Sequence, residues 1–326
     1  MRALAIGLRV LGGNMRLLVG LWLTSLVVAA PLALAVRSSL EESIGPSLVH
    51  ESLQKGFDMA WHGEYAQAAR GIERSVRPSM AGGGALLDNA EAWLTGNLFQ
   101  QDPTLVGVGV LYALLWTFLL GGVLDRLAHP DGERSAGRFA RACGAYFPRF
   151  LLLTGLAGAL YYGVYRSAGW LLGRVEEWTR DVTTERTVLA ITLAAWAAVA
   201  LALVVVYVWL TLARVSLVKG DRPGALAAVW HGGSVLLRRP QRTLGAYLVY
   251  AALGAGLVSL YVVIAPAAGP ASIAGLLLAF ALGQACLLVK LALRFGVLAA
   301  LTEEYGRACA DWTQAVSTGG PGRSSK

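Results

Sequence analysis

Six long stretches of the chain consist of apolar residues without a charged side chain. These uncharged runs cover residues 17–36, 104–124, 150–165, 187–213, 243–265 and 272–289. Most of them approach the roughly 20 residues that a helix needs to cross a hydrocarbon core about 30 Å thick. The third run reaches this length if Arg166 extends toward the headgroups and the helix continues to Leu172. The pattern therefore predicts six membrane-spanning helices, at 17–36, 104–124, 150–172, 187–213, 243–265 and 272–297.

The polar segments that precede the third and fifth runs resemble each other. A constant shift places Asp131 on Asp221, Arg149 on Arg239 and Gly155 on Gly245. Each segment carries one apolar stripe with the spacing i, i+3, i+4, i+7, i+11 of a helix face. The stripes are Ala136, Phe139, Ala140, Cys143 and Phe147 in the first copy, and Leu226, Val229, Trp230, Gly233 and Leu237 in the second. In each copy we expect an amphipathic elbow helix that leads into a hairpin of two spans.

The predicted fold is an all-α bundle of six transmembrane helices, arranged as three hairpins with elbow helices and an extracytoplasmic helical cap. Its parts are an N-terminal amphipathic segment at 1–16, hairpin 1 at 17–124 with an outer insert at 37–103, an elbow plus hairpin 2 at 125–213, an elbow plus hairpin 3 at 214–300, and a tail at 301–326 with a disordered end. The outer insert is too long for a simple connection, so we expect it to cap the bundle.

The distribution of charge predicts the orientation. Nineteen Arg and Lys residues lie on the side of the bundle that holds both termini, and eight lie on the opposite side. The positive-inside rule then places both termini in the cytoplasm, which an even number of spans also requires. The first run resembles a signal peptide at Ala33-Leu34-Ala35, but its full twenty apolar residues favour an uncleaved anchor.

Composition agrees with this class. Of the 326 residues, 56% are apolar and 15% are charged, and the mean hydropathy is +0.56. A soluble domain carries about 25% charged residues. The excess of Arg over Lys, with abundant Ala and Gly, is typical of a GC-rich bacterial genome, so we expect a bacterial inner membrane. The sequence contains no recognisable catalytic, cofactor or metal motif, and no pair of cysteines has metal-binding spacing, so we predict no catalytic residue, cofactor or metal.

Arginines gather where the elbow segments meet the following spans. In "SVLLRRPQRTLGAYLVY" these are Arg238, Arg239 and Arg242, and Arg149 occupies the related position in the first copy. An apolar stripe with arginines at its end, feeding directly into a span, is typical of an interfacial helix whose charges meet anionic headgroups. Pro240 would allow the chain to turn into the membrane. Nucleic-acid binding is disfavoured because the segment lacks a polar helix face and interleaved aromatics.

The outer insert contains one group of polar and aromatic residues, in "GFDMAWHGEY". Asp58, Trp61 and Glu64 would lie on one side of a helix and could receive a basic or amide-rich partner, with Trp61 as an exposed anchor. The alternative is that Trp61 anchors the cap to the bilayer or to the bundle beneath it. In that case the tryptophan contributes stability and no partner.

Few polar residues lie within the predicted spans. Gln284, near the middle of the sixth, could bind a ligand, although an interhelical hydrogen bond is favoured. Lys290 and Arg294 share a helix face, and we expect both to extend toward headgroups. The uncharged runs contain no Asp or Glu, which argues against a proton-coupled carrier.

Several strings together resemble a group of bacterial six-span membrane proteins with no assigned function. They are "GFDMAWHGEY", "LLDN", "LLWTFLLGGVLDR", "ACGAYFPRF" and "RRPQRTLGAYL". The resemblance implies the topology and no mechanism, and where relatives carry two adjacent tryptophans this chain has Trp61-His62. We therefore expect a non-enzymatic accessory or scaffold subunit that contacts membrane lipids or another membrane protein. The alternatives are a transporter or permease component and, less favoured, an intramembrane enzyme.

Overall fold

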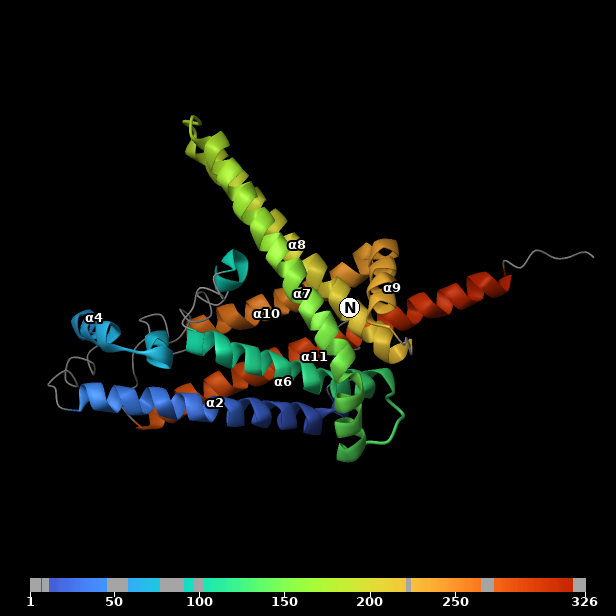
Figure 1. Cartoon of the computed structure of the whole chain (residues 1–326), viewed down its shortest axis with the longest axis horizontal. Coiled ribbons are helices and arrows are strands. Elements are labelled where there is room, and N and C mark those ends of the chain that lie inside the picture. The colour runs from blue at the N-terminus through green and yellow to red at the C-terminus, as the bar shows by residue number, and fades with distance from the viewer. Residues whose placement is uncertain are drawn as a thin grey trace, which may run out of the picture. The chain divides into compact units, whose positions relative to one another are not determined.

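A computed structural model describes Gly7 and residues 12–45, 58–76, 91–96, 103–220, 224–264 and 273–318, and all regular structure within these ranges is helical. The helices are α2 (Met15–Ile44), α4 (Met59–Ala68), the 3-10 helix η1 (Gly71–Ser75), α6 (Pro103–Ala128), α7 (Ala136–Thr179), α8 (Glu185–Lys219), α9 (Ala225–Arg238), α10 (Pro240–Ile264) and α11 (Ile273–Thr318) (Figure 1). Most of the segment predicted at 1–16, much of the outer insert and the end of the tail lie outside the described residues.

Six of these helices, α2, α6, α7, α8, α10 and α11, are long and apolar enough to cross a membrane. Each coincides with one of the six predicted spans, so the prediction of six such helices is confirmed. Several exceed a single crossing. At 1.5 Å per residue the 46 residues of α11 extend about 69 Å, more than twice a hydrocarbon core.

The chain divides into two compact units. The first contains residues 1–10, 115–250 and 296–326, and the second contains residues 11–114 and 251–295. The helices α6, α10 and α11 therefore contribute residues to both units.

The core of the first unit includes a long antiparallel pair formed by α7 and α8 (Figure 1). Small residues of α7 pack into aliphatic side chains of α8. Ala157 lies against Val206 and Leu210, and nearer the connection Ala168 lies against Val199 and Leu203. Small residues allow close approach of helix backbones in a lipid environment, where van der Waals packing drives association.

The two copies of the repeated segment differ in structure. In the second, α9 ends at Arg238 and α10 begins at Pro240. In the first, the expected separate elbow helix is absent, because α7 runs unbroken from Ala136 to Thr179 with Pro148 inside it. Its apolar stripe packs on α6, where Cys143 is fully buried. Adjacent glycines on α6 permit this approach, since a Cβ on Gly122 would lie 2.7 Å from the Cys143 sulfur.

Candidate functional site

The helix α9 is too short to span a membrane. Its 14 residues extend about 21 Å, compared with a core of about 30 Å. In sequence it lies between two helices that are long enough, α8 and α10. The role of α9 is therefore something other than crossing the membrane.

One face of α9 packs on the end of α8. Gly232 makes this contact possible, because a Cβ at that position would lie 2.6 Å from the backbone nitrogen of Ala213. Two hydrogen bonds join the helices as well. The Ser216 hydroxyl donates to the Ala228 carbonyl at 3.2 Å, and the Trp209 indole nitrogen donates to the Val229 carbonyl at 2.9 Å. These contacts attach this face of α9 to α8.

The opposite face of α9 is apolar and uncovered. Leu226 is 83% exposed, Trp230 is 79% exposed and Leu237 is 81% exposed. These three residues, the exposed stripe, belong to the apolar stripe that the sequence identified. Large apolar side chains gathered on one helix face mark a contact surface rather than a solvent-facing one.

At its C-terminal end α9 breaks sharply and α10 starts. The break falls at Arg239, whose φ of −136° and ψ of 51° lie outside the helical region. Pro240 is the first residue of α10, a position that suits its fixed φ and missing N–H. The Thr243 hydroxyl donates to the Arg239 carbonyl at 3.0 Å and holds the first turn.

The arginines of this junction are not equivalent. The guanidinium of Arg238 lies over the ring of Trp312, 4.8 Å from its centroid. Arg239 forms an ion pair with Asp311. Arg242 is exposed, and no ion pair of its guanidinium lies among the described residues. The C-terminal part of α11 therefore holds two of the arginines and leaves the third open.

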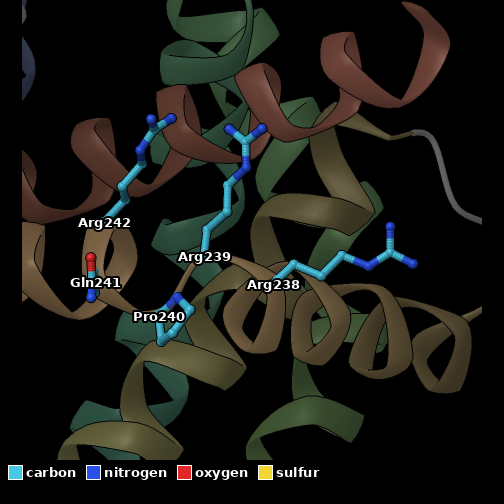
Figure 2. Close-up of a pocket in the computed structure, with 5 residues that line it drawn as sticks. All are labelled: Arg238, Arg239, Pro240, Gln241 and Arg242. Atoms are coloured by element: carbon cyan, nitrogen blue, oxygen red, sulfur yellow. The ribbon is translucent and has the colours of Figure 1, made fainter. Parts of the chain in front are cut away.

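A hollow of about 450 Å³ lies at the same junction, lined by Arg238, Arg239, Pro240, Gln241 and Arg242. We refer to it as the arginine hollow. Figure 2 shows the side chains of Arg239 and Arg242 extending in the same direction, whereas Arg238 extends away from them. The Nη1 atom of Arg239 is buried and has no hydrogen-bond partner within the described part of the chain. The arrangement is basic, concave and adjacent to an apolar face.

The sequence did not single out Asp311 and Trp312. Both lie on α11, which continues through the predicted tail as far as Thr318. Buried residues at its continuation, including Leu301 and Tyr305, show why the helix does not stop at the end of the apolar run. The repeating apolar positions after residue 297 were the signal that could have indicated this extension.

Arg149, the equivalent of Arg239 in the first copy, does not line the arginine hollow. It is partly exposed on α7, one residue after Pro148. Lys290 and Arg294 are exposed on α11. Gln284 accepts a hydrogen bond of 3.0 Å from the indole nitrogen of Trp22, which joins α11 to α2 within the second unit. The structure thus brings Arg238, Arg239 and Arg242 together and leaves the other predicted residues apart.

In the outer insert, Trp61 is not the exposed anchor that the sequence predicted. It is only 8% exposed, stacks on Tyr65 at 5.3 Å and donates a 3.2 Å hydrogen bond to the Ser43 hydroxyl. The reason is local, because Asp58 caps α4 by accepting from the backbone nitrogens of residues 60 and 61. The helix thereby turns Trp61 toward α2, and Glu64 stays exposed.

A second group of polar contacts joins three helices within the first unit. Arg214 of α8 donates to the Thr154 hydroxyl of α7 at 3.3 Å, and that hydroxyl lies 3.4 Å from the hydroxyl of Thr117 on α6. Threonine hydroxyls that bond across helices stabilise membrane bundles modestly. We interpret this group as interhelical packing.

The chain was compared with protein-family models, with curated proteins and with solved structures, and no match was found in any of the three. The resemblance to bacterial six-span proteins therefore stays a prediction. The function is therefore inferred from the geometry of the chain itself.

Proposed function

We propose that this multi-pass membrane protein is a non-enzymatic accessory or scaffold protein that binds the anionic surface of the bilayer through the junction of α9 and α10. The observation that carries the proposal is the exposed stripe of α9, whose three large apolar side chains are 79–83% exposed beside a cluster of arginines. In the proposed arrangement the stripe enters the boundary between headgroups and acyl chains, and the arginines meet lipid phosphates. We place this junction on the cytoplasmic face of a bacterial inner membrane.

Two features support a bilayer surface rather than a soluble partner. The neighbouring helices α8 and α10 are both long and apolar enough to span, so a short helix between them stays near the membrane boundary. Trp230 on the stripe also belongs to the residue type that is enriched at membrane interfaces. Apolar stripe and positive charge together are complementary to anionic lipid.

The proposal is tested by replacing Arg238, Arg239 and Arg242 together with glutamine. Each arginine near an anionic surface contributes about 1 kcal/mol of attraction, so the triple variant should bind anionic lipid up to about 100-fold more weakly. The thermal midpoint of the purified protein in mild detergent is measured as phosphatidylglycerol or phosphatidylcholine is added. Phosphatidylglycerol should raise the midpoint of the wild type and have little effect on the variant, because a ligand stabilises only the state that binds it.

The matched control replaces Arg174, Arg180 and Arg186 with glutamine. These arginines flank the connection between α7 and α8, on the side predicted to face away from the cytoplasm. This control should respond to phosphatidylglycerol as the wild type does. An equal response of the Arg238, Arg239 and Arg242 variant would contradict the proposal. Substrate-dependent flux through proteoliposomes would instead place the protein among transporters.

A further inference from the structure

The charges around the arginine hollow are not balanced by the protein. Three arginines line it, and Asp311 supplies the one carboxylate that pairs with them among the described residues. The guanidinium of Arg238 faces the aromatic ring of Trp312 instead of an acid. Three arginines and one carboxylate leave this junction with a net charge of +2, which favours a dianion over a singly charged group.

Arg239 has a donor that no group within the described ranges satisfies. Its Nη2 atom is engaged by Asp311, whereas Nη1 of the same guanidinium is buried and has no hydrogen-bond partner within the described ranges. Buried donors are nearly always satisfied in folded proteins, and an unsatisfied one is unfavourable. The planar fork of an arginine matches phosphate oxygens, so a phosphate oxygen would satisfy this atom once the Arg239 side chain turned it toward the hollow.

Arg242 supplies a second positive group on the same side. It lies three residues after Arg239, in the first turn of α10, and Figure 2 shows both guanidinium groups at the same side of that turn. The N-terminus of a helix also favours an anion through its dipole. Every helix has such an end, and it is the hollow, the unbalanced charge and the buried Nη1 atom that distinguish this one.

From these observations we propose that the arginine hollow binds a dianionic phosphate group, the chemistry of a phosphate monoester, carried by a lipid headgroup such as that of phosphatidic acid. A phosphate monoester bears about −1.5 to −2 charges near neutral pH, whereas a phosphodiester such as phosphatidylglycerol bears one. This inference rests on the proposed function, because the exposed stripe of α9 would hold the hollow at headgroup depth. Soluble phosphate has the same chemistry and is the competing source.

The test compares three probes on the full chain in mild detergent: phosphatidic acid, phosphatidylglycerol and inorganic phosphate. Apparent affinities are taken from the rise of the thermal midpoint with probe concentration. We expect phosphatidic acid to bind about tenfold more tightly than phosphatidylglycerol, since one more charge-assisted hydrogen bond is worth at least that factor. Inorganic phosphate should bind more weakly than phosphatidic acid because it lacks the acyl chains.

Arg239→Lys is the diagnostic variant. It keeps the charge but removes the fork, so the preference for phosphatidic acid over phosphatidylglycerol should fall about tenfold while binding of phosphatidylglycerol persists. Arg242→Lys should reduce the same preference, and because its side chain is exposed the fold is not at risk. The matched control is Arg149→Lys, at the equivalent position of the other copy and away from the hollow, where the preference should be unchanged.

The outcomes separate this inference from the proposed function. Equal affinities for phosphatidic acid and phosphatidylglycerol, both unaffected by Arg239→Lys, would overturn the phosphate site and leave a general anionic surface. No stabilisation by either lipid would overturn the proposed function as well. Tight binding of inorganic phosphate that Arg239→Lys abolishes, with no gain from phosphatidic acid, would overturn the lipid as the source of the phosphate.

Discussion

Individual side chains show how little of a residue's role is fixed by its type. Trp61 and Trp230 both lie in short helices, yet Trp61 is 8% exposed and Trp230 is 79% exposed. The first is turned inward by the cap that Asp58 provides. The second faces outward because the other side of its helix is occupied by α8. Sequence periodicity identifies a stripe but does not say what covers it.

Replacing Trp61 by alanine should therefore destabilise the outer insert. Truncating a buried tryptophan costs about 3–5 kcal/mol, through lost burial and the cavity that remains. The thermal midpoint in detergent should fall, and no particular protein should be lost on co-purification. Met59→Ala is the control, since Met59 lies on the same helix and is 65% exposed. An unchanged thermal midpoint together with the loss of a specific partner would contradict this prediction and favour Trp61 as a binding anchor.

At the scale of elements, the attachment of α9 to α8 depends on one position without a side chain. Gly232→Ala would place a Cβ 2.6 Å from the backbone of Ala213, and a backbone cannot move aside as a side chain can. Overpacking of this kind costs about 1–3 kcal/mol, against a gain of about 1 kcal/mol in helix propensity. We expect a lower thermal midpoint and a weaker response to anionic lipid.

The control for this prediction is Gly245→Ala in α10. Within the described part of the chain, no atom outside the immediate helix lies within 4 Å of a Cβ at that position. The substitution should keep or raise the thermal midpoint, because alanine favours a helix over glycine. If Gly232→Ala proved as harmless as Gly245→Ala, the close packing of α9 on α8 would be wrong.

The helices themselves could be predicted from the sequence, and their ends and partners could not. Uncharged runs locate six apolar helices because burying a charged side chain in lipid is unfavourable, so segments that cross a membrane contain few charged residues. The same runs do not show that α2 continues to Ile44 or α11 to Thr318, since polar extensions are held by packing. The repeat predicted two separate elbow helices, but α7 is continuous through Pro148 and packs on Gly121 and Gly122 of α6.

The candidate site could likewise be predicted only in part, because local sequence patterns do not show tertiary contacts. A short stretch of sequence was enough to identify three of its arginines, because Arg238, Arg239 and Arg242 lie close together in the chain. Asp311 and Trp312, which engage two of them, are about seventy positions away in the chain, and their contact is a tertiary one. The arginines therefore looked interchangeable in the sequence and are distinct in the structure.

At the scale of the whole molecule, the proposals depend on where the α9–α10 junction lies relative to the membrane. Six helices long enough to span place α9 between the fourth and the fifth of them. The uneven distribution of Arg and Lys, nineteen against eight, favours the cytoplasmic side for this junction and for both termini. The proposed lipid site faces the anionic inner leaflet only with that orientation.

The most direct test is a set of fusions to a reporter enzyme that is active only outside the cytoplasm. Fusion after Gly83, in the outer insert, should give an active reporter. Fusions after Gly220, immediately before the α9 region, and after Lys326 should be inactive and remain in the cytoplasm. An active reporter after Gly220 or Lys326 would contradict the six-span orientation and, with it, the placement of the arginine hollow at the cytoplasmic headgroups.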